Sequence, residues 1–259
     1  MPTPKGITAA CLITLLAGCA AIPPQPEVLS LPYIKSFSEN LPGAEVPQGW
    51  ERWTLSKLKK PTQYQLVDYD GKTVVKASAQ ASASGLMHRL QIEPGKYPLL
   101  HWRWKVTGLI PSADNTRRQS EDSPVRVVVS FDGDTDSLPL EDRVFFDNIR
   151  LLTGQQLPYA TLMYIWENRA PKNQVIPNPH TSRIKMIVVE SGRDKVGSWQ
   201  EVTRNVAEDF RRAFGEAPGK ITAIGIMTDT DNTGENVHAY YGDIQFRRVA
   251  PPRTVLAHD

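Results

Sequence analysis

Carboxylate side chains alternate in one short loop near the end of the chain. Asp229 and Asp231 stand two residues apart and are soon followed by Gly234. This spacing is typical of the first half of a calcium-binding loop, in which alternating oxygens surround one cation and a glycine allows a sharp turn. An EF-hand is excluded, because Tyr240 stands at the twelfth position, where that motif needs a glutamate.

The loop leaves two interpretations open. It predicts either a tight connection whose Asp and Asn side chains bond the backbone, or a structural Ca²⁺ site formed by Asp229, Asp231 and Asp243. A second acidic run, residues 132–136, follows a predicted strand and is typical of a solvated loop. The two loops would share a cation only if they met at one end of the fold.

Residues 100–106 alternate between apolar and basic side chains. Since side chains alternate along a strand, the two tryptophans of this run face a core, while His101, Arg103 and Lys105 face outward. Arg126, on a neighbouring run, is predicted to face outward too. Such a cationic sheet face suits a carboxylated or phosphorylated sugar, because arginine forks onto carboxylate oxygens. An ordinary solvent-facing sheet surface is the alternative.

A second ligand-binding prediction concerns Trp166 and Glu167, in the run Tyr-Ile-Trp-Glu-Asn-Arg that begins at Tyr164. Sugars stack on aromatic rings, and the neighbouring polar groups would bond their hydroxyls. The alternative places Trp166 in the core.

Catalytic motifs are absent from the sequence. It has no Gly-x-Ser-x-Gly elbow, no phosphate-binding loop and no His-Glu-x-x-His helix. A lyase that uses His101 or Tyr164, with arginines to neutralise a uronate, stays open as an alternative. The catalytic residues remain unidentified, and the sequence favours a binding protein over an enzyme.

Many short β-rich runs, separated by Gly, Pro, Asn and Asp, predict a mainly all-β, antiparallel β-sandwich that forms a single domain over residues 35–250. One helix is predicted in the C-terminal third. It would begin at a capping box of Ser198 and Glu201, and Gly215 would end it.

The first residues resemble a bacterial lipoprotein signal. Lys5, a short apolar run and Leu-Ala-Gly precede Cys19, so residues 1–18 are predicted to be a signal peptide. The resemblance implies that Cys19 carries acyl chains such as palmitate. Residues 19–34 then form a proline-rich tether, and residues 251–259 a C-terminal tail. Because Ala20 is not an aspartate, the same resemblance implies the periplasmic face of the outer membrane.

Charge argues against nucleic acid as a partner. Lys5 is the one charged residue before Cys19, so the mature chain carries 29 basic and 28 acidic residues. A nearly neutral chain with scattered arginines lacks the basic surface that nucleic acid requires.

The chain resembles the bacterial family called domain of unknown function 3047. The resemblance runs from "RVVVSFDGD" through "YIWENR" and is most specific over residues 199–246, a stretch that ends in "YGDIQF". It covers roughly residues 35–248 and implies a secreted or periplasmic β-sandwich, but no reaction. "YGDIQF" is also similar to the last strand of jelly-roll carbohydrate-binding modules.

Three functions follow from these observations. The first is a lipid-anchored envelope protein of jelly-roll-like fold that binds a glycan or another envelope molecule. The second is a polysaccharide-degrading enzyme of the lyase type. The third is a structural or assembly lipoprotein that binds another envelope protein.

Overall fold

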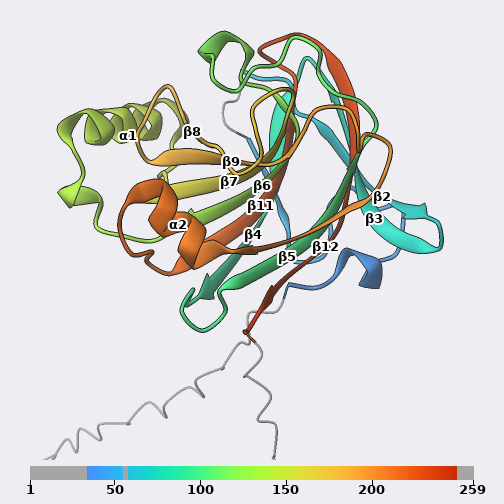
Figure 1. Cartoon of the computed structure of the whole chain (residues 1–259), viewed down its shortest axis with the longest axis horizontal. Helices are drawn as coiled ribbons and strands as arrows, with labels where there is room; N and C mark the ends of the chain where they lie inside the picture. Colours follow the sequence, from blue (N-terminus) through green and yellow to red (C-terminus); the bar gives the residue numbers. More distant parts are fainter. Residues whose placement is uncertain (1–33, 55–57, 250–259) are drawn as a thin grey trace, which may run out of the picture. The chain divides into compact units, whose positions relative to one another are not determined.

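The alternating run at residues 99–106 forms the strand β5 (Leu99–Val106), in which every second side chain is buried. The structure, a computed structural model, describes residues 34–54 and 58–249. Its strands form two sheets packed face to face, with two helices at one end (Figure 1). This confirms the predicted jelly-roll-like β-sandwich.

The strands fall into sheets of seven and five. The seven-stranded sheet has the order β1 (Glu51–Trp53), β4 (Ala83–Ile92), β11 (Ile221–Asp229), β6 (Ser123–Phe131), β7 (Ala160–Glu167), β9 (Ile184–Ser191) and β8 (Val175–Pro177). The five-stranded sheet has the order β10 (Gln200–Asn205), β5, β12 (Asn236–Arg247), β3 (Lys72–Gln80) and β2 (Gln63–Tyr69). Neighbouring strands are antiparallel except β7 and β9, which are parallel.

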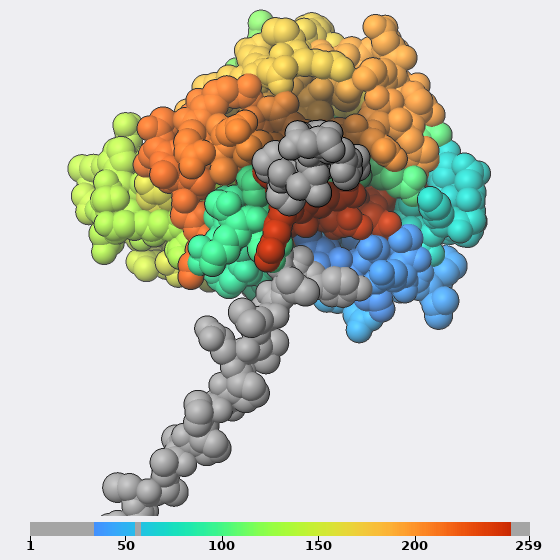
Figure 2. Space-filling model, turned by 60° about the horizontal axis from the view of Figure 1, so that its bottom comes forward, coloured from blue at the N-terminus to red at the C-terminus, as the bar shows by residue number. Residues whose placement is uncertain are grey.

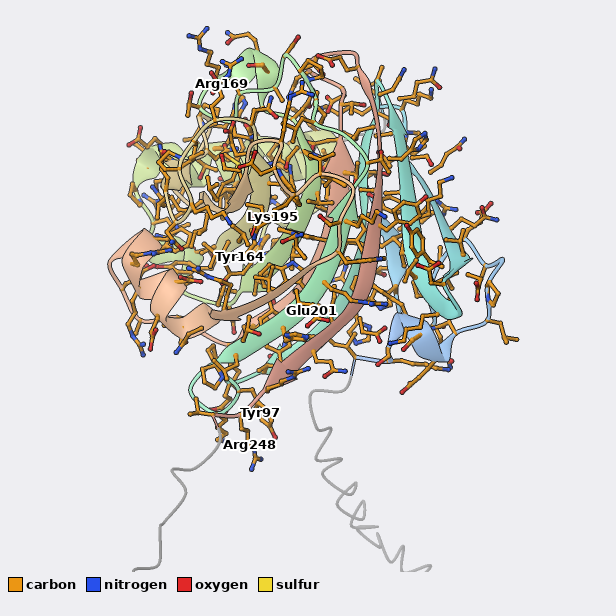
Figure 3. All side chains as sticks on the ribbon, turned by 45° about the vertical axis from the view of Figure 1, so that its right-hand side comes forward. Tyr97, Tyr164, Arg169, Lys195, Glu201 and Arg248 are labelled. Atoms are coloured by element: carbon orange, nitrogen blue, oxygen red, sulfur yellow. The ribbon has the colours of Figure 1, made fainter. Side chains whose placement is uncertain are left out.

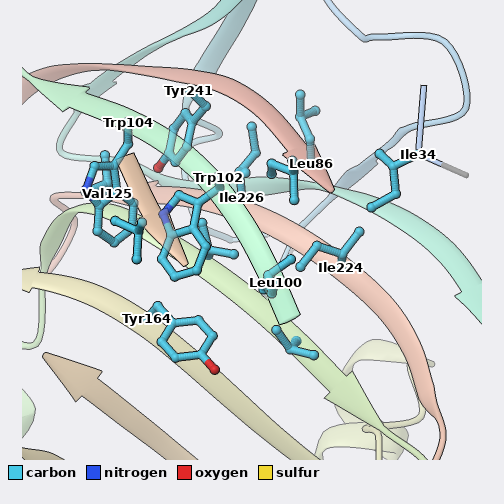
Figure 4. Packing of buried hydrophobic residues seen from close by; sticks show 14 of the residues in the cluster. Ile34, Leu86, Leu100, Trp102, Trp104, Val125, Tyr164, Ile224, Ile226 and Tyr241 are labelled. Atoms are coloured by element: carbon cyan, nitrogen blue, oxygen red, sulfur yellow. The ribbon is translucent and has the colours of Figure 1, made fainter. Parts of the chain in front are cut away.

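The main core lies between the two sheets. Trp102 and Trp104 of β5 are fully buried there, as predicted, and the ring of Tyr164 lies 5.0 Å from that of Trp102 (Figure 4). The alternation of β5 therefore directs its odd-numbered side chains to the outer face of the five-stranded sheet.

The seven-stranded sheet is also covered on its other face. A second apolar cluster includes Val128, Met163, Ile165 and Met186, on β6, β7 and β9. Every residue of β6 and of β7 is buried. Strands buried on both faces do not alternate between apolar and polar residues, so the rule that polar side chains face solvent fails for them.

The C-terminal helix is shorter than predicted. Residues 200–205 form β10, which pairs with β5 over its whole length, and α2 (Val206–Phe214) begins only after it. The Asn205 side chain, rather than Ser198, caps the helix by accepting a hydrogen bond from the backbone N–H of Glu208. Sheet pairing and the burial of Val202 override the capping-box pattern. Gly215 ends the helix at φ 77°, as predicted.

A second helix, α1 (Leu140–Thr153), was not predicted, although Pro139 precedes it and Gly154 ends it in a left-handed conformation. Three short 3₁₀ helices complete the described chain: η1 (Phe37–Glu39), η2 (Arg118–Ser120) and η3 (Thr135–Ser137). Within the described ranges, neither α1 nor α2 is long and apolar enough to cross a membrane.

The predicted signal peptide, Cys19, the tail at residues 251–259 and the tether up to residue 33 lie outside the described residues. The described residues all belong to one compact unit.

Candidate functional site

Three aromatic rings meet on the outer side of the five-stranded sheet. They come from Tyr69 at the end of β2, Trp199 just before β10 and Tyr240 in β12. Their centroids lie 5.6 Å apart for Tyr69 and Trp199, 4.9 Å for Tyr69 and Tyr240, and 6.4 Å for Trp199 and Tyr240. All three side chains are partly exposed. We call Tyr69, Trp199 and Tyr240 the aromatic cluster.

Two cations of β5 lie on these rings. The guanidinium of Arg103 is 4.6 Å from the centre of the Trp199 ring. The ammonium of Lys105 is 5.0 Å from the centre of the Tyr69 ring and donates a hydrogen bond of 2.6 Å to its hydroxyl. The Arg103 contact is a cation–π geometry, whereas Lys105 is held by its hydrogen bond at the hydroxyl edge of Tyr69. Both contacts fix long, flexible side chains in one place.

Gly242 of β12 makes room for Arg103. A Cβ atom at position 242 would lie 2.3 Å from Nε and 2.4 Å from Cγ of Arg103. The register of β12 against β5 shifts between Tyr241 and Ile244, so an irregularity of the strand lies at the same place. The missing side chain lets Arg103 lie against the strand and reach the Trp199 ring.

The face continues along β10, the edge strand of this sheet. Glu201 pairs with Arg103 across the strands, and Thr203 pairs with His101. His101 Nδ1 and Thr203 Oγ1 share a hydrogen bond of 2.9 Å. Partial burial, with Arg247 nearby, lowers the pKa of His101. Figure 3 shows Glu201 at this face, with Tyr97 and Arg248 together at the lower end of the molecule.

The space-filling view shows the surroundings of the face. The dark red surface of β12 lies between the orange segment that precedes β10 and the cyan β2–β3 hairpin, with the blue N-terminal segment below it (Figure 2). His101 and Arg103, both predicted from sequence, thus lie on one face together with side chains far away in the sequence.

The aromatic cluster itself was not predicted. The sequence pattern assigns Trp199 to the start of a helix, and it predicts no ligand contact at Tyr69 or Tyr240. The sequence did contain a signal for Tyr240. Residues 236–241 alternate in a way that places Tyr240 on the face opposite Ala239 and Tyr241, and in β12 these two neighbours are buried.

Trp166 and Glu167 lie inside the protein instead. Trp166 is 0% exposed and donates a hydrogen bond from Nε1 to the carbonyl of Gly192. Glu167 accepts hydrogen bonds from the backbone N–H groups of Asn115, Arg169 and Ala170. The prediction that these two side chains stack on and bond a glycan is corrected, and the core interpretation of Trp166 holds.

Arg126 is also buried, at 2% exposure, which corrects its predicted outward position. Its Nε and Nη2 donate to the two oxygens of Asp229 at 2.9 and 3.0 Å, and Nη2 also donates to the carbonyl of Glu121 at 3.0 Å. Burial raises the pKa of Asp229 to about 6, and Arg126 opposes that rise. Burial lowers the pKa of Arg126, but Asp229 and Glu121 raise it more, so the guanidinium stays charged.

The predicted calcium ligands are only partly together. Carboxylate oxygens of Asp122, Asp229 and Asp231 lie within 4.8 Å of one another, whereas Asp243 accepts two hydrogen bonds from Ser38 elsewhere. Asp122, which was not predicted, joins them because the loop before β6 meets the end of β11.

Protein donors already serve most of these oxygens. Arg126 takes both oxygens of Asp229, and Lys59 pairs with Asp231. Backbone N–H groups of Asn232 and Thr233 donate to Asp122. Among the described residues, Asp231 Oδ1 is buried and has no hydrogen-bond donor, so these three carboxylates could still hold a cation. Arg126 and Lys59 already neutralise part of their charge. The other acidic loop, residues 132–136, lies apart from these three carboxylates. It follows Phe131 at one end of β6, whereas Asp229 pairs with Ser123 at the other end.

Tyr164 does not suit the role of a catalytic base. Its ring is fully buried and its hydroxyl donates to Asp209 at 3.0 Å. Burial and the nearby Asp209 carboxylate raise the pKa of Tyr164 well above its ordinary value. A group held protonated inside the core cannot accept a proton from a substrate at neutral pH.

A family model described as "Protein of unknown function (DUF3047)" matches residues 48–245. No curated protein matches the sequence.

Several solved structures are similar to this chain at low identity. The xyloglucanase domain of NopAA from Sinorhizobium fredii, in complex with cellobiose, has 6% identity and a TM-score of 0.43, over 80% of this chain and 98% of that one. The xylan-binding domain CBM22-1 from Paenibacillus barcinonensis Xyn10C has 11% identity and a TM-score of 0.33, over 83% and 93%. The glycoside hydrolase domain of Endo-D from Streptococcus pneumoniae R6 has 8% identity and a TM-score of 0.34. There the match covers 78% of this chain and only 22% of the other.

Proposed function

The chain belongs to the DUF3047 family of proteins of unknown function, and we propose that it binds an acidic glycan on the outer face of its five-stranded sheet. One observation carries the proposal: the aromatic cluster is partly exposed and has a guanidinium and an ammonium group on its rings. Sugar rings pack their apolar faces on aromatic side chains, and polar groups beside the rings fix their orientation.

The cations give the preference for an acidic glycan. The guanidinium carbon of Arg103 lies 4.6 Å from the centre of the Trp199 ring, and a planar guanidinium held there has several N–H groups with which to fork onto a carboxylate. Lys105 has three donors, of which one is bonded to Tyr69. The ordering of both cations before binding lowers the entropy cost of holding a uronate there.

The proposal includes a location. The domain is held in the cell envelope by a lipid on Cys19, at the periplasmic face of the outer membrane. The support is the signal-like sequence around Cys19. A glycan of the envelope would then be within reach of the domain.

Isothermal titration calorimetry tests the glycan site. Uronate polymers such as alginate and polygalacturonate should bind, and more weakly as salt is added, because screening weakens exposed charge pairs. We expect Trp199→Ala to lower the affinity about tenfold, which corresponds to about 1.4 kcal/mol. Arg103→Ala should lower the affinity for acidic polymers more than the affinity for neutral ones such as dextran.

The matched control is Tyr97→Ala. Tyr97 also pairs with an arginine, Arg248, 4.9 Å from its ring, but both lie at the lower end of the molecule, away from Glu201 of β10 (Figure 3). This variant should keep the affinity of the parent. Equal affinities for the parent and a folded Trp199→Ala variant would disprove the proposed site.

A protein partner is the second candidate, and one observation favours it. Four large apolar side chains of α1 are exposed: Leu140, Val144, Leu151 and Leu152, at 68%, 49%, 80% and 83%. Apolar side chains grouped on one surface element are typical of interaction sites. If no polysaccharide binds, this helix is the surface that an assembly lipoprotein would use.

A further inference from the structure

A polar cavity of about 490 Å³ lies where β10 ends and α2 begins. It is lined by Asn173, Thr203, Arg204, Asn205, Glu208, Asp209 and Arg212. Because β10 runs directly into α2 (Figure 1), the cavity and the aromatic cluster lie at opposite ends of one strand.

The floor of the cavity is fixed by hydrogen bonds. Asp209 is 5% exposed and accepts bonds from Arg204 Nε at 2.8 Å and Nη2 at 2.6 Å, and from Arg212 Nη2 at 3.1 Å. The buried hydroxyl of Tyr164 donates to the same carboxylate, and Arg204 Nη1 donates to Asn173 Oδ1 at 2.8 Å. The two arginines are therefore held in place before any ligand arrives.

The charges of the lining cancel. Arg204 and Arg212 stand against Glu208 and Asp209, and the remaining lining side chains are two amides and a hydroxyl. Such a set offers donors and acceptors together, which matches the hydroxyl groups of a neutral sugar better than a carboxylate or phosphate. No aromatic side chain is among the lining residues, so a sugar would be held here by its hydroxyls rather than by stacking.

The strand between the two places is open and polar. The side chains of Glu201 and Thr203 are exposed on β10, beside Arg103 and His101 of β5. The six residues of β10 span about 20 Å at the usual rise of a strand. A disaccharide is too short to cover that distance, whereas a hexasaccharide can.

The structure assigns a second sugar subsite to this cavity: a linear glycan lies along β10, with a uronate on the aromatic cluster and a neutral sugar in the cavity. The ligand class is thus an acidic heteroglycan that contains both kinds of sugar. This inference rests on the proposed function, because the aromatic cluster supplies the other end of the binding site.

The test compares two chain lengths by isothermal titration calorimetry on the full chain. Hyaluronan oligosaccharides are suitable probes, because uronate and neutral sugars alternate in them. We expect the hexasaccharide to bind at least about tenfold more tightly than the disaccharide, a difference of about 1.4 kcal/mol. Glu208→Ala should remove this difference and leave disaccharide affinity unchanged.

The matched control is Glu141→Ala, since Glu141 is also a glutamate in the first turn of a helix but lies on α1. It should alter neither affinity. Equal affinity of the two oligosaccharides for the parent, or a Glu208→Ala variant that keeps the tenfold difference, would overturn the second subsite. If the two bind equally and Trp199→Ala weakens both, the proposed function stands without the subsite. If neither oligosaccharide binds but polygalacturonate does, the subsite fails and the proposed function stands; if no uronate polymer binds either, both ideas fail.

Discussion

At the scale of single residues, two tryptophans of this chain have opposite roles. Trp166 points into the core and is 0% exposed, whereas Trp199 lies at the surface with Arg103 on its ring. Both stand beside a glutamine or glutamate in the sequence, and both are compatible with stacking on a sugar. Only their surroundings separate an anchor of the core from a ligand contact.

Substitution by alanine should separate the two roles. We expect Trp166→Ala to lower the free energy of unfolding by about 3–5 kcal/mol, because it leaves a large cavity in the core. Trp199→Ala should change it by far less, since a partly exposed ring gives up less packing. Urea unfolding followed by circular dichroism measures both. Equal losses of stability in the two variants would contradict this assignment.

At the scale of elements, α1 is attached to the sandwich through a polar contact. Asp142 is the buried residue of this helix, and it accepts hydrogen bonds from Thr181 Oγ1 at 2.6 Å and from the backbone N–H of Ser182 at 3.0 Å. Burial raises the pKa of Asp142, but the hydrogen bonds from Ser182 and Thr181 together lower it by more, so the net shift is downward.

Removal of this carboxylate should loosen α1 selectively. We expect Asp142→Ala to lower the free energy of unfolding by about 1–3 kcal/mol, which is the usual loss when buried donors are left unpaired. Hydrogen exchange should become faster in residues 140–153 and stay slow in β5. The control is Asp147→Ala, an exposed position on the same helix. Unchanged exchange in α1 would show that the contact does not hold the helix.

The same carboxylate gives a pH dependence with a definite sign. A folded-state pKa below the ordinary 3.8 means that the ionised group stabilises the fold above that pH. The contribution is lost as the pH falls below 3.8, through the lower folded-state pKa. Asp142→Ala should therefore be less sensitive to acid than the parent over this range.

At the scale of the whole molecule, the centre of the seven-stranded sheet is covered on both faces, and this is why charges became buried there. Arg126 of β6 joins Asp229 of β11 to the loop that contains Asn115 and Glu121. Three segments far apart in the sequence therefore meet at one guanidinium.

Loss of this guanidinium should destabilise the whole fold. We expect Arg126→Met to lower the free energy of unfolding by about 3–5 kcal/mol, because Asp229 stays buried without its partner and must either hold an unpaired charge or take up a proton. The double variant Arg126→Met with Asp229→Leu should recover much of that loss. Denaturant unfolding of the parent, both single variants and the double variant gives the coupling energy. A single variant as stable as the parent would show that the pair is dispensable.

The sequence by itself determined the sandwich, the inward tryptophans and outward cations of residues 100–106, and the end of α2 at Gly215. These features depend on alternation and on local backbone preferences, and both are set by residues that are neighbours in the sequence. Cys19 and its predicted lipid also rest on local sequence, and they stay predictions.

Only the tertiary structure decided which side chains share a face. The aromatic cluster joins residues 69, 199 and 240, and the contact of Arg103 with Trp199 depends on the space above Gly242. Burial of Arg126 and Trp166 likewise depends on what covers each face of their sheet. Alternation shows that two faces differ, but which of them meets solvent is set by packing of segments distant in the sequence.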